Sequence, residues 1–394
     1  MTAPPSSCRF LGTLILICAA GLASASTPAG PIKQVRYVMG TLCEITLYPS
    51  AEEHSEPPGT AEERATAALD AAFDELKRID TVLSNWNSDS DLMRMNLRAA
   101  SPGNLRPRVR VSDELFERLQ VALRIAGETR GAFDPTVGPL VRAWGFLPPC
   151  ATPVPCRKET RAAAIAEAKR RVGWQKVTLY PETKEVQFAV PAMEIDLGGI
   201  AKGYAVERAI QILKEHGIRS ALVNLGKSSL KALGPPPRQP DCAQDRADEC
   251  RAWPVSVVDP RDRRQVAARI YLHDGDALAT SGTYENTIGK GKNRRSHLID
   301  PSTGRALGGE ASVSVICSDA EAADALTKPF ILRGDLKSAS AGQVLRLYPQ
   351  CGVVLISVQR GQLERRTAGR LESRAEGGTR TYSMAAVRLN QEQH

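Results

Sequence analysis

Long apolar runs are missing from this sequence outside its first 25 residues. Because a membrane-spanning helix needs roughly 20 consecutive apolar residues, this absence excludes a polytopic membrane protein. Histidine is also scarce, with five in 394 residues, which leaves few candidates for a general base. The hydrophobic fraction of 42% and the charged fraction of 24% are those of a globular chain, which excludes a disordered or fibrous protein.

A strong excess of one charge is absent too. The formal net charge is +8, and removal of residues 1–25 would take away one arginine and no acid, which leaves 8 − 1 = +7. A charge of this size is mild and favours an anionic partner such as a phosphate-bearing ligand or a lipid headgroup. The basic residues are spread along the chain without a recognised nucleic-acid motif, so we expect no nucleic-acid partner.

The N-terminal apolar stretch has the pattern of a secretory signal peptide. Arg9 precedes the apolar run 10–22, and Ala23-Ser24-Ala25 provides the small residues of a cleavage site. We therefore predict a signal peptide at 1–25, a linker at 26–32, and an exported soluble protein with no transmembrane span after cleavage. The alternative is an uncleaved segment that anchors the protein to a membrane.

Seven cysteines follow the predicted cleavage site. Cys150 with Cys156, and Cys242 with Cys250, flank short Pro-rich or polar segments. In an exported protein each pair predicts a local disulfide that closes a surface insertion, near 147–157 and 234–252. Zinc is the alternative, although the spacing does not fit a zinc knuckle. Buried thiols are the ordinary explanation for cysteines inside apolar strands, which applies to Cys43 and Cys317; the state of Cys351 is left open.

Apolar spacing and turn residues predict a mixed α and β chain. The 4-3-4-3 spacing of Ala65, Leu69, Ala72, Leu76 and Ile79 is typical of an amphipathic helix. Further helices are predicted at 112–127, 158–171, 199–216 and 319–328. Strands are predicted at 33–48, 175–180, 185–190, 221–225, 254–258, 266–272, 311–317, 352–358 and 382–389. Without a regular βαβ alternation, the pattern favours an α+β fold, and the polar tail 359–380 is expected to be disordered.

Two segments place polar groups beside an aromatic or a turn. Ser84-Asn85-Trp86-Asn87 could stack Trp86 on a flat ring, or it could be a helix-terminal turn with a packed Trp. Gly131-Ala132-Phe133-Asp134-Pro135 places a carboxylate on a Pro-fixed turn that a ligand could approach closely, or it is an ordinary Asp-Pro turn.

The segment 194–204 runs from an apolar strand through Gly198-Gly199 into a helix. Free N–H groups at a helix N-terminus, together with Lys202, form a plausible phosphate cradle, with Asp196 at the strand end. The glycine spacing is not that of a Walker A loop. The helix itself has apolar faces that belong in a core, so function and packing both explain the segment.

A candidate base and a candidate cation site come from the second half of the chain. Of the five histidines, only His297 is enclosed by a Ser, an Asp-Pro and apolar residues, so it is the candidate general base, although a structural role is the alternative. Asp324 and Thr327 lie one helical turn apart and could bind one oxygen-liganded cation. The alternative is a capped helix with an i,i+4 pair between Asp324 and Lys328.

The order of these motifs is more specific evidence of a protein family than any single motif. MGT, SNWN, GAFDPTVGPLVRAWGF, IDLGGIAKGYAVE, NLG, ATSG, SHLIDPSTG and ADALT follow one another from residue 39 to residue 327. This arrangement resembles the ApbE family of FAD:protein FMN transferases. The resemblance implies one catalytic domain over 33–390, with two intertwined α/β lobes of the T-fold-like type and a ligand cleft between them.

The resemblance also implies an activity and its partners. Such enzymes transfer FMN from FAD to a Thr or Ser hydroxyl of an exported acceptor protein through a phosphoester bond, release AMP, and use Mg²⁺. The acceptor would be a respiratory or electron-transfer subunit, and with the export signal the location would be the periplasm. The alternatives are a degenerate FAD-binding protein or flavin assembly factor, and an FAD pyrophosphate hydrolase.

Site residues follow from the resemblance position by position. Eight residues would line FAD: Met39, Trp86, Ala132, Phe133, Asp134, Asp196, Lys202 and Leu298. The Gly199 carbonyl, Asp324 and Thr327 would bind the metal. His297 would be the catalytic base that deprotonates the acceptor hydroxyl.

Two departures from the family pattern affect the metal. After NLG the family has a second Gly and an Asp, whereas this chain has Lys227-Ser228. Four residues after the helix Asp the family has Thr, whereas this chain has Lys328, followed by Pro329, which could distort the helix. We therefore hypothesise that the Lys328 ammonium pairs with Asp324 near the metal position and either replaces the ion or lowers its affinity.

Overall fold

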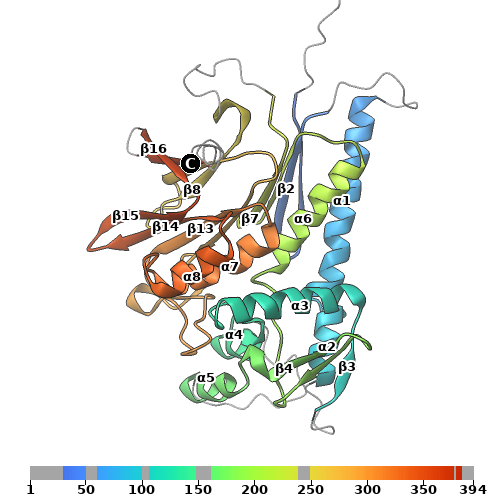
Figure 1. The fold of residues 1–394 in the computed structure, drawn as a ribbon, viewed down its shortest axis with the longest axis vertical. Helices are drawn as coiled ribbons and strands as arrows, with labels where there is room; N and C mark the ends of the chain where they lie inside the picture. The colour runs from blue at the N-terminus through green and yellow to red at the C-terminus, as the bar shows by residue number, and fades with distance from the viewer. Residues whose placement is uncertain are drawn as a thin grey trace, which may run out of the picture.

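The computed structural model describes residues 30–49, 60–99, 106–147, 161–237, 249–376 and 379–383 (Figure 1). The predicted signal peptide, residues 26–29 of the predicted linker, the Cys150–Cys156 pair, and most of the insertions 147–157 and 234–252 lie outside this range. Within it, no helix combines the length and the apolar character that crossing a membrane requires.

An eight-stranded antiparallel sheet forms the centre of the molecule. Its order is β1-β2-β6-β7-β10-β13-β14-β15. The strands are β1 (Ile32–Val38), β2 (Thr41–Leu47), β6 (Ala221–Leu225), β7 (Ser229–Leu233), β10 (Ala277–Gly282), β13 (Ala311–Cys317), β14 (Gly352–Gln359) and β15 (Gln362–Gly369). Every neighbouring pair is antiparallel, as hairpins and short returns allow.

Three smaller sheets accompany it among the described residues. One has the order β16-β17-β9-β8, another β3-β5-β4, and the third pairs β11 with β12. Their bounds are β3 (Arg108–Arg110), β4 (Val177–Tyr180), β5 (Glu185–Phe188), β8 (Trp253–Val258), β9 (Val266–Leu272), β11 (Thr287–Ile288), β12 (Arg295–Ser296), β16 (Glu372–Glu376) and β17 (Thr379–Ser383).

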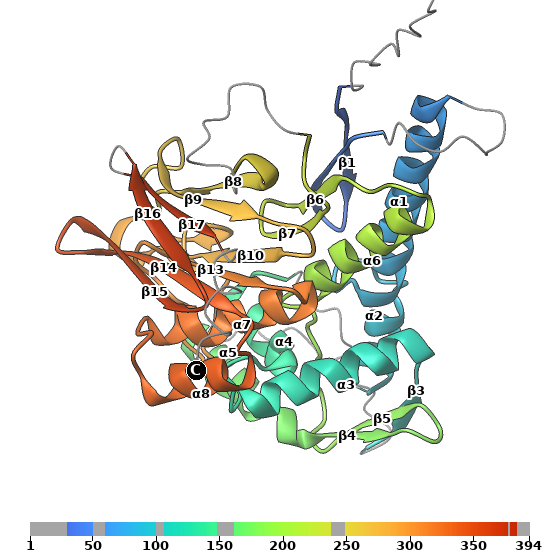
Figure 2. The same ribbon diagram turned by 45° about the horizontal axis from the view of Figure 1, so that its top comes forward.

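The helices belong to two regions, which Figure 1 shows above and below α3, and Figure 2 shows α1 and α6 of the upper region side by side. The helices are α1 (Ala61–Leu83), α2 (Asp91–Ala99), α3 (Asp113–Glu128), α4 (Gly138–Trp144), α5 (Arg161–Arg170), α6 (Ala201–Glu215), α7 (Ala320–Arg333) and α8 (Ala339–Leu347). α1, α6 and α7 lie by the large sheet, whereas α2, α4, α5 and the β3-β5-β4 sheet form the second region. The chain leaves the large sheet after α1 and returns with α6, so the two regions are intertwined.

Alternating side chains place the large sheet between two cores. In β14, Val353 and Leu355 join the core beneath the helices, whereas Val354 and Ile356 join the core against the β16-β17-β9-β8 sheet. The period of two follows from strand geometry. The α+β prediction is confirmed.

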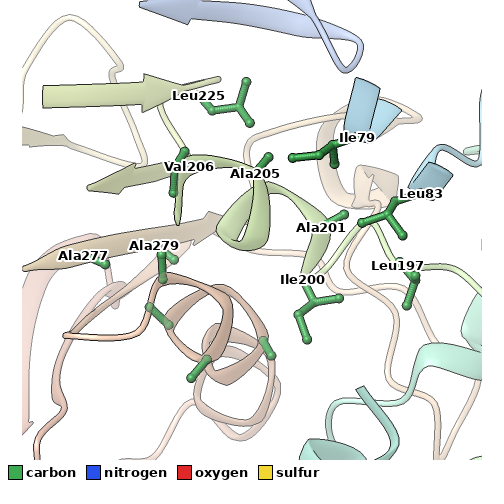
Figure 3. Packing of buried hydrophobic residues seen from close by; sticks show 14 of the residues in the cluster. Ile79, Leu83, Leu197, Ile200, Ala201, Ala205, Val206, Leu225, Ala277 and Ala279 are labelled. Carbon is green, nitrogen blue, oxygen red and sulfur yellow. The ribbon is translucent and has the colours of Figure 1, made fainter. Parts of the chain in front are cut away.

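The start of α6 is packed into the first of these cores. Figure 3 shows Ala201 and Ala205 of α6 beside Ile79 and Leu83 of α1, with strand residues on the other side. Small residues let the helices approach closely. A Cβ added at Gly203 would lie 2.2 Å from the Ala320 carbonyl oxygen, so the crossing of α6 and α7 requires a glycine there.

Three predictions were wrong. The tail expected to be disordered holds β15, β16 and the first residues of β17; β15 is a half-exposed edge strand, so it lacks the apolar alternation that would have revealed it. The predicted helix 319–328 continues through Pro329 to Arg333. Cys317 is not a thiol but forms a disulfide with Cys351, because the ends of β13 and β14 bring their Cα atoms to 4.5 Å.

Cys43 and Cys250 agree with the predictions of a buried thiol and a disulfide. Cys43 is a free, buried thiol, and burial raises its pKa to about 12. Cys250 is disulfide-bonded, and its predicted partner Cys242 lies outside the described residues.

Candidate functional site

The junction that leads into α6 is fixed by two buried asparagines. The amide nitrogens of Asn85 and Asn96 both donate to the Ile195 carbonyl at 2.9 Å, and the Ile195 N–H donates to Asn96 Oδ1 at 2.9 Å. The Asp196 N–H donates to the Pro135 carbonyl at 2.7 Å. Three motifs that are distant in sequence, SNWN, FDPT and IDLGG, therefore meet at one point of the fold.

The first turn of α6 leaves donors open. Its N-cap residue, Ile200, offers no side-chain cap, and the Lys202 N–H has no partner among the described residues. The Lys202 ammonium likewise forms no hydrogen bond or ion pair with them. Burial lowers its pKa, with the neighbouring Lys328 charge adding to the effect and Asp324 opposing it. The turn is thus equipped to bind an anion.

Asp196 stands at the entrance to this turn. Its Oδ1 accepts the Gly198 N–H at 2.8 Å. Burial raises the pKa of the Asp196 carboxyl, and Glu194 adds to this, while Arg142 and Lys328 oppose it. Glu194 is itself buried and paired with Arg142 through the guanidinium Nε at 3.0 Å. This pair lies near Asp196 and helps to hold the segment before α6, which was predicted to be a strand but forms none in the structure.

Lys328 fills the position at which a cation was expected. Its Nζ donates to the Gly199 carbonyl at 3.0 Å, to the Asp324 carbonyl at 2.9 Å and to Asp324 Oδ1 at 2.9 Å. The Asp324 side chain is almost fully buried, and its Oδ2 accepts the Gly203 N–H at 3.2 Å.

Thr327, the third expected ligand, is directed elsewhere. Its Oγ1 bonds Ser281 Oγ at 2.8 Å and donates to the Asp324 carbonyl at 2.7 Å. In the described part of the chain, no group of three or more His, Cys, Asp or Glu side chains could hold a metal. A Mg²⁺ ion needs oxygen ligands at about 2.0–2.1 Å, and here an ammonium already occupies the oxygens that would supply them. The residues present therefore do not fit the metal.

His297 lies near both lysines. Its Nδ1 is 3.2 Å from the Glu285 carbonyl oxygen, which can only accept, so Nδ1 carries the proton and Nε2 keeps its lone pair. Burial lowers the pKa of His297 to about 4, and the charges of Lys202 and Lys328 contribute. The imidazole is therefore neutral at neutral pH. The ring also meets Phe146 edge-on, with centroids 6.4 Å apart.

The Asp134 carboxylate bonds both its own turn and the Trp174 backbone. Oδ1 accepts from the Thr136 N–H and hydroxyl at 2.8 and 2.6 Å, and Oδ2 accepts the Trp174 N–H at 3.1 Å. Burial nevertheless raises its pKa. Ala132 and Phe133 are buried beside it, and Phe133 Cε2 lies 3.4 Å from where a Cβ on Gly199 would be. This turn therefore supports the start of α6.

The remaining predicted residues differ in exposure. Trp86 is 68% exposed, which contradicts the alternative of a packed Trp. Met39 and Gly40 form the β1–β2 turn, both with positive φ, and Met39 is half-buried against the main core. Leu298 is buried, and its carbonyl accepts the Leu307 N–H at 2.8 Å.

Sequence reasoning missed the supports of the site rather than its centre. Asn96, Ser281, Glu285 and the Arg142–Glu194 pair were not identified. None belongs to a spacing pattern that implies its role, since each acts on a residue distant in sequence. Three of them did lie in segments that the sequence singled out, because Ser281 belongs to ATSG, Arg142 to GAFDPTVGPLVRAWGF and Glu194 to the segment 194–204.

Comparisons with known proteins relate this chain to one family. A family model described as "ApbE family" matches residues 39–345. The FAD:protein FMN transferase of Klebsiella pneumoniae (strain 342) is 31% identical over 346 residues, which cover 85% of this chain and 88% of that protein. The protein of the same name from Treponema pallidum (strain Nichols) is 31% identical over 366 residues, 89% of this chain and 92% of that one.

Solved structures show the same fold. The flavin transferase ApbE from Vibrio cholerae superposes with a TM-score of 0.67 at 24% identity, over 86% of this chain and 98% of that one. The ApbE protein from Thermotoga maritima gives a TM-score of 0.64 at 29% identity, over 85% and 97%. This chain belongs to the ApbE family, because the family model matches most of the chain and because relatives are 31% identical to it over 88% and 92% of their own lengths.

Proposed function

We propose that this protein is an FAD:protein FMN transferase, which moves FMN from FAD to a Thr or Ser hydroxyl of an acceptor protein and releases AMP. Its membership of a family of transferases supports this function. The observation that carries it is the proximity of a neutral His297, a Lys202 ammonium that bonds none of the described residues, and the first turn of α6, whose N-cap Ile200 provides no side-chain cap. Together these groups provide a base beside an anion site.

In this proposal the diphosphate of FAD lies at the start of α6. The Lys202 ammonium and the Lys202 N–H would donate to the diphosphate oxygens. Neither donor has another partner in the described part of the chain. Trp86 would stack on a flat ring of FAD, because its indole is exposed on a loop that Asn85 fixes. Met39, Ala132, Phe133, Asp134, Asp196 and Leu298 would line or support the ligand.

His297 would start the reaction. Its Nε2 takes the proton of the acceptor hydroxyl as that oxygen bonds to the phosphorus of the FMN half. The bond from this phosphorus to the bridging oxygen breaks, and AMP leaves with that oxygen and its electron pair. The product is a phosphoester between FMN and the acceptor. Lys202 and Lys328 would offset the negative charge that spreads over the phosphoryl oxygens.

The acceptor would be an exported protein, and the signal pattern at 1–25 supports a periplasmic location. The Cys317–Cys351 disulfide is consistent with an oxidising compartment. A respiratory or electron-transfer subunit is the proposed class of acceptor.

The direct test incubates the purified protein with FAD and an exported domain that carries a Thr acceptor, with and without Mg²⁺. Flavin fluorescence on the acceptor in a denaturing gel is expected. Bound FAD without turnover would instead indicate a flavin-binding protein, and free FMN plus AMP would indicate a hydrolase; either contradicts the proposal.

His297→Ala tests the base. Transfer should fall about 10²–10⁴-fold while FAD stays bound, because a general base contributes roughly that factor. His216→Ala is the matched control, since His216 is exposed at the far end of α6, and it should transfer normally. Unchanged transfer in His297→Ala would refute the assignment.

A further inference from the structure

We propose that the Lys328 ammonium takes the place of the divalent cation in this chain, so that FMN transfer here needs no metal ion. The inference rests on the proposed function for its activity, but its structural part concerns only Gly199, Asp324 and Lys328. Lys328 would not merely weaken the binding of an ion, because its ammonium would itself occupy the cation's position.

The ammonium is fully satisfied where it lies. It has three N–H donors, and the Gly199 carbonyl, the Asp324 carbonyl and Asp324 Oδ1 accept them at 2.9 to 3.0 Å. The Gly199 carbonyl comes from the turn before α6, 129 residues away from Lys328 in sequence. Lys328 therefore joins the two elements that a bound ion would otherwise join.

An additional ion would compete with the ammonium for the same oxygens. A Cβ built on Gly199 would lie 2.9 Å from Lys328 Cε, so the lysine stem packs directly against this turn. An ion that used the same oxygens would stand about 3 Å or less from a positive charge, and repulsion at that distance is strong in a buried site. The ion and the ammonium exclude each other.

A backbone N–H and two hydroxyls around Asp324 are also bonded without an ion. Asp324 Oδ2 accepts the Gly203 N–H at 3.2 Å and the Ser229 hydroxyl at 3.4 Å. The Thr327 hydroxyl, which could have been a ligand, bonds Ser281 and the Asp324 carbonyl. The lone acid in this group thus has its negative charge balanced by Lys328, at a side-chain exposure of 6% for Asp324 and 18% for Lys328.

A division of roles follows. Because all three N–H groups of Lys328 are used, Lys328 contributes charge to the phosphoryl group but no direct hydrogen bond. Direct bonding falls to Lys202, whose ammonium is unpartnered in the described part of the chain. In a metal-dependent site, one ion would both bond the phosphate and supply the charge.

The test measures Mn²⁺ binding by electron paramagnetic resonance in the wild type, in Lys328→Thr, and in Lys337→Thr as a control with the same substitution at an exposed position. We expect no stoichiometric Mn²⁺ in the wild type or the control, and at least tenfold tighter binding in Lys328→Thr, which frees the oxygens and adds a hydroxyl. One equivalent of Mn²⁺ bound equally by the wild type and Lys328→Thr would overturn the proposal.

Thermal unfolding gives a second readout that does not depend on activity. Lys328→Met keeps much of the side-chain volume but leaves the buried Asp324 carboxylate unpaired, so its Tm should fall and then rise again when Mg²⁺ is added. The wild-type Tm should not respond to Mg²⁺. A wild-type Tm that rises with Mg²⁺ as much as that of Lys328→Met contradicts the replacement.

Activity completes the test. Wild-type transfer should change less than twofold in excess EDTA, and its loss in EDTA would overturn the inference. If no condition gives transfer while Mn²⁺ is still excluded, the proposed function fails but the position of Lys328 in the cation site is supported. The two failures are therefore distinguishable.

Discussion

The start of α6 differs from the starts of α1, α3, α7 and α8. In those four helices a hydroxyl or carboxylate N-cap accepts a backbone N–H of the first turn; the caps are Thr60, Ser112, Asp319 and Ser338. α6 begins at Ile200 with no such cap. In α6 the equivalent donor, the Gly203 N–H, bonds Asp324 Oδ2 of α7 instead, and the Lys202 N–H has no partner among the described residues. The comparison teaches that the four capped starts serve the fold, whereas the start of α6 keeps a backbone donor for which an anion would supply the acceptor.

The largest effect is expected for Gly203→Ala, in the first turn of α6. The added methyl would meet the Ala320 carbonyl at 2.2 Å and force α6 away from α7, so we expect a loss of about 3 kcal/mol in unfolding free energy. Urea denaturation measures it. Gly342→Ala in α8 is the matched control, because a Cβ there would meet only the end of Arg346 at 3.5 Å; a similar loss in both variants would contradict the close-packing argument.

Lys202→Met should act on ligand binding instead of stability. The Lys202 ammonium bonds none of the described residues, so its removal deletes only one charged hydrogen bond to the diphosphate, worth about 2 kcal/mol, and FAD affinity should fall roughly 30-fold. Stability should not fall, because no bond to the protein is lost. Fluorescence titration with FAD measures the effect, with Lys214→Met at the exposed end of α6 as control. Equal affinity in both variants would mean that the open start of α6 does not bind FAD.

The pH dependence of transfer tests whether burial and the nearby lysine charges keep His297 neutral. The pKa of His297 is about 4 instead of 6.5, and the base must be neutral, so kcat/KM should be flat above about pH 5 and fall about tenfold per pH unit below 4. Lys202→Met removes a repelling charge and should move the inflection upward. An inflection near 6.5 in the wild type would contradict a desolvated His297.

Asp319→Ala has the smallest expected effect. It removes the oxygen that accepts the Ala322 N–H at 3.0 Å, and a lost N-cap costs about 1 kcal/mol in unfolding free energy. FAD affinity should be unchanged, because a capped start serves the fold. A marked loss of FAD binding would remove the distinction between the two kinds of helix start.

Local patterns predicted much of the fold. The amphipathic spacing of 65–79 lies within α1, and the predicted cap Ser112 accepts the Leu115 N–H in α3. α8 was missed because its nine residues are too few for a clear period. β7 and β10 were missed because they are buried on both faces and lack alternation.

The candidate site was predictable only in part, for a related reason. The pairing of Lys328 with Asp324 spans one helical turn, so the sequence could suggest it. The bond from Lys328 to the Gly199 carbonyl and the bonds of Asn85 and Asn96 to Ile195 join distant segments. Such contacts depend on how the elements pack, which no local spacing encodes.

The Ile195 carbonyl has a consequence for ligand choice. Because it accepts from both Asn85 and Asn96, the loop bearing Trp86 cannot shift independently of Asp196. Under the proposed function, the ring-stacking surface and the phosphate end stay at a constant separation. A dinucleotide long enough to reach both the Trp86 surface and the start of α6 would gain binding free energy from both sites. A shorter flavin would reach only one of them, so the constant separation would select ligands by length.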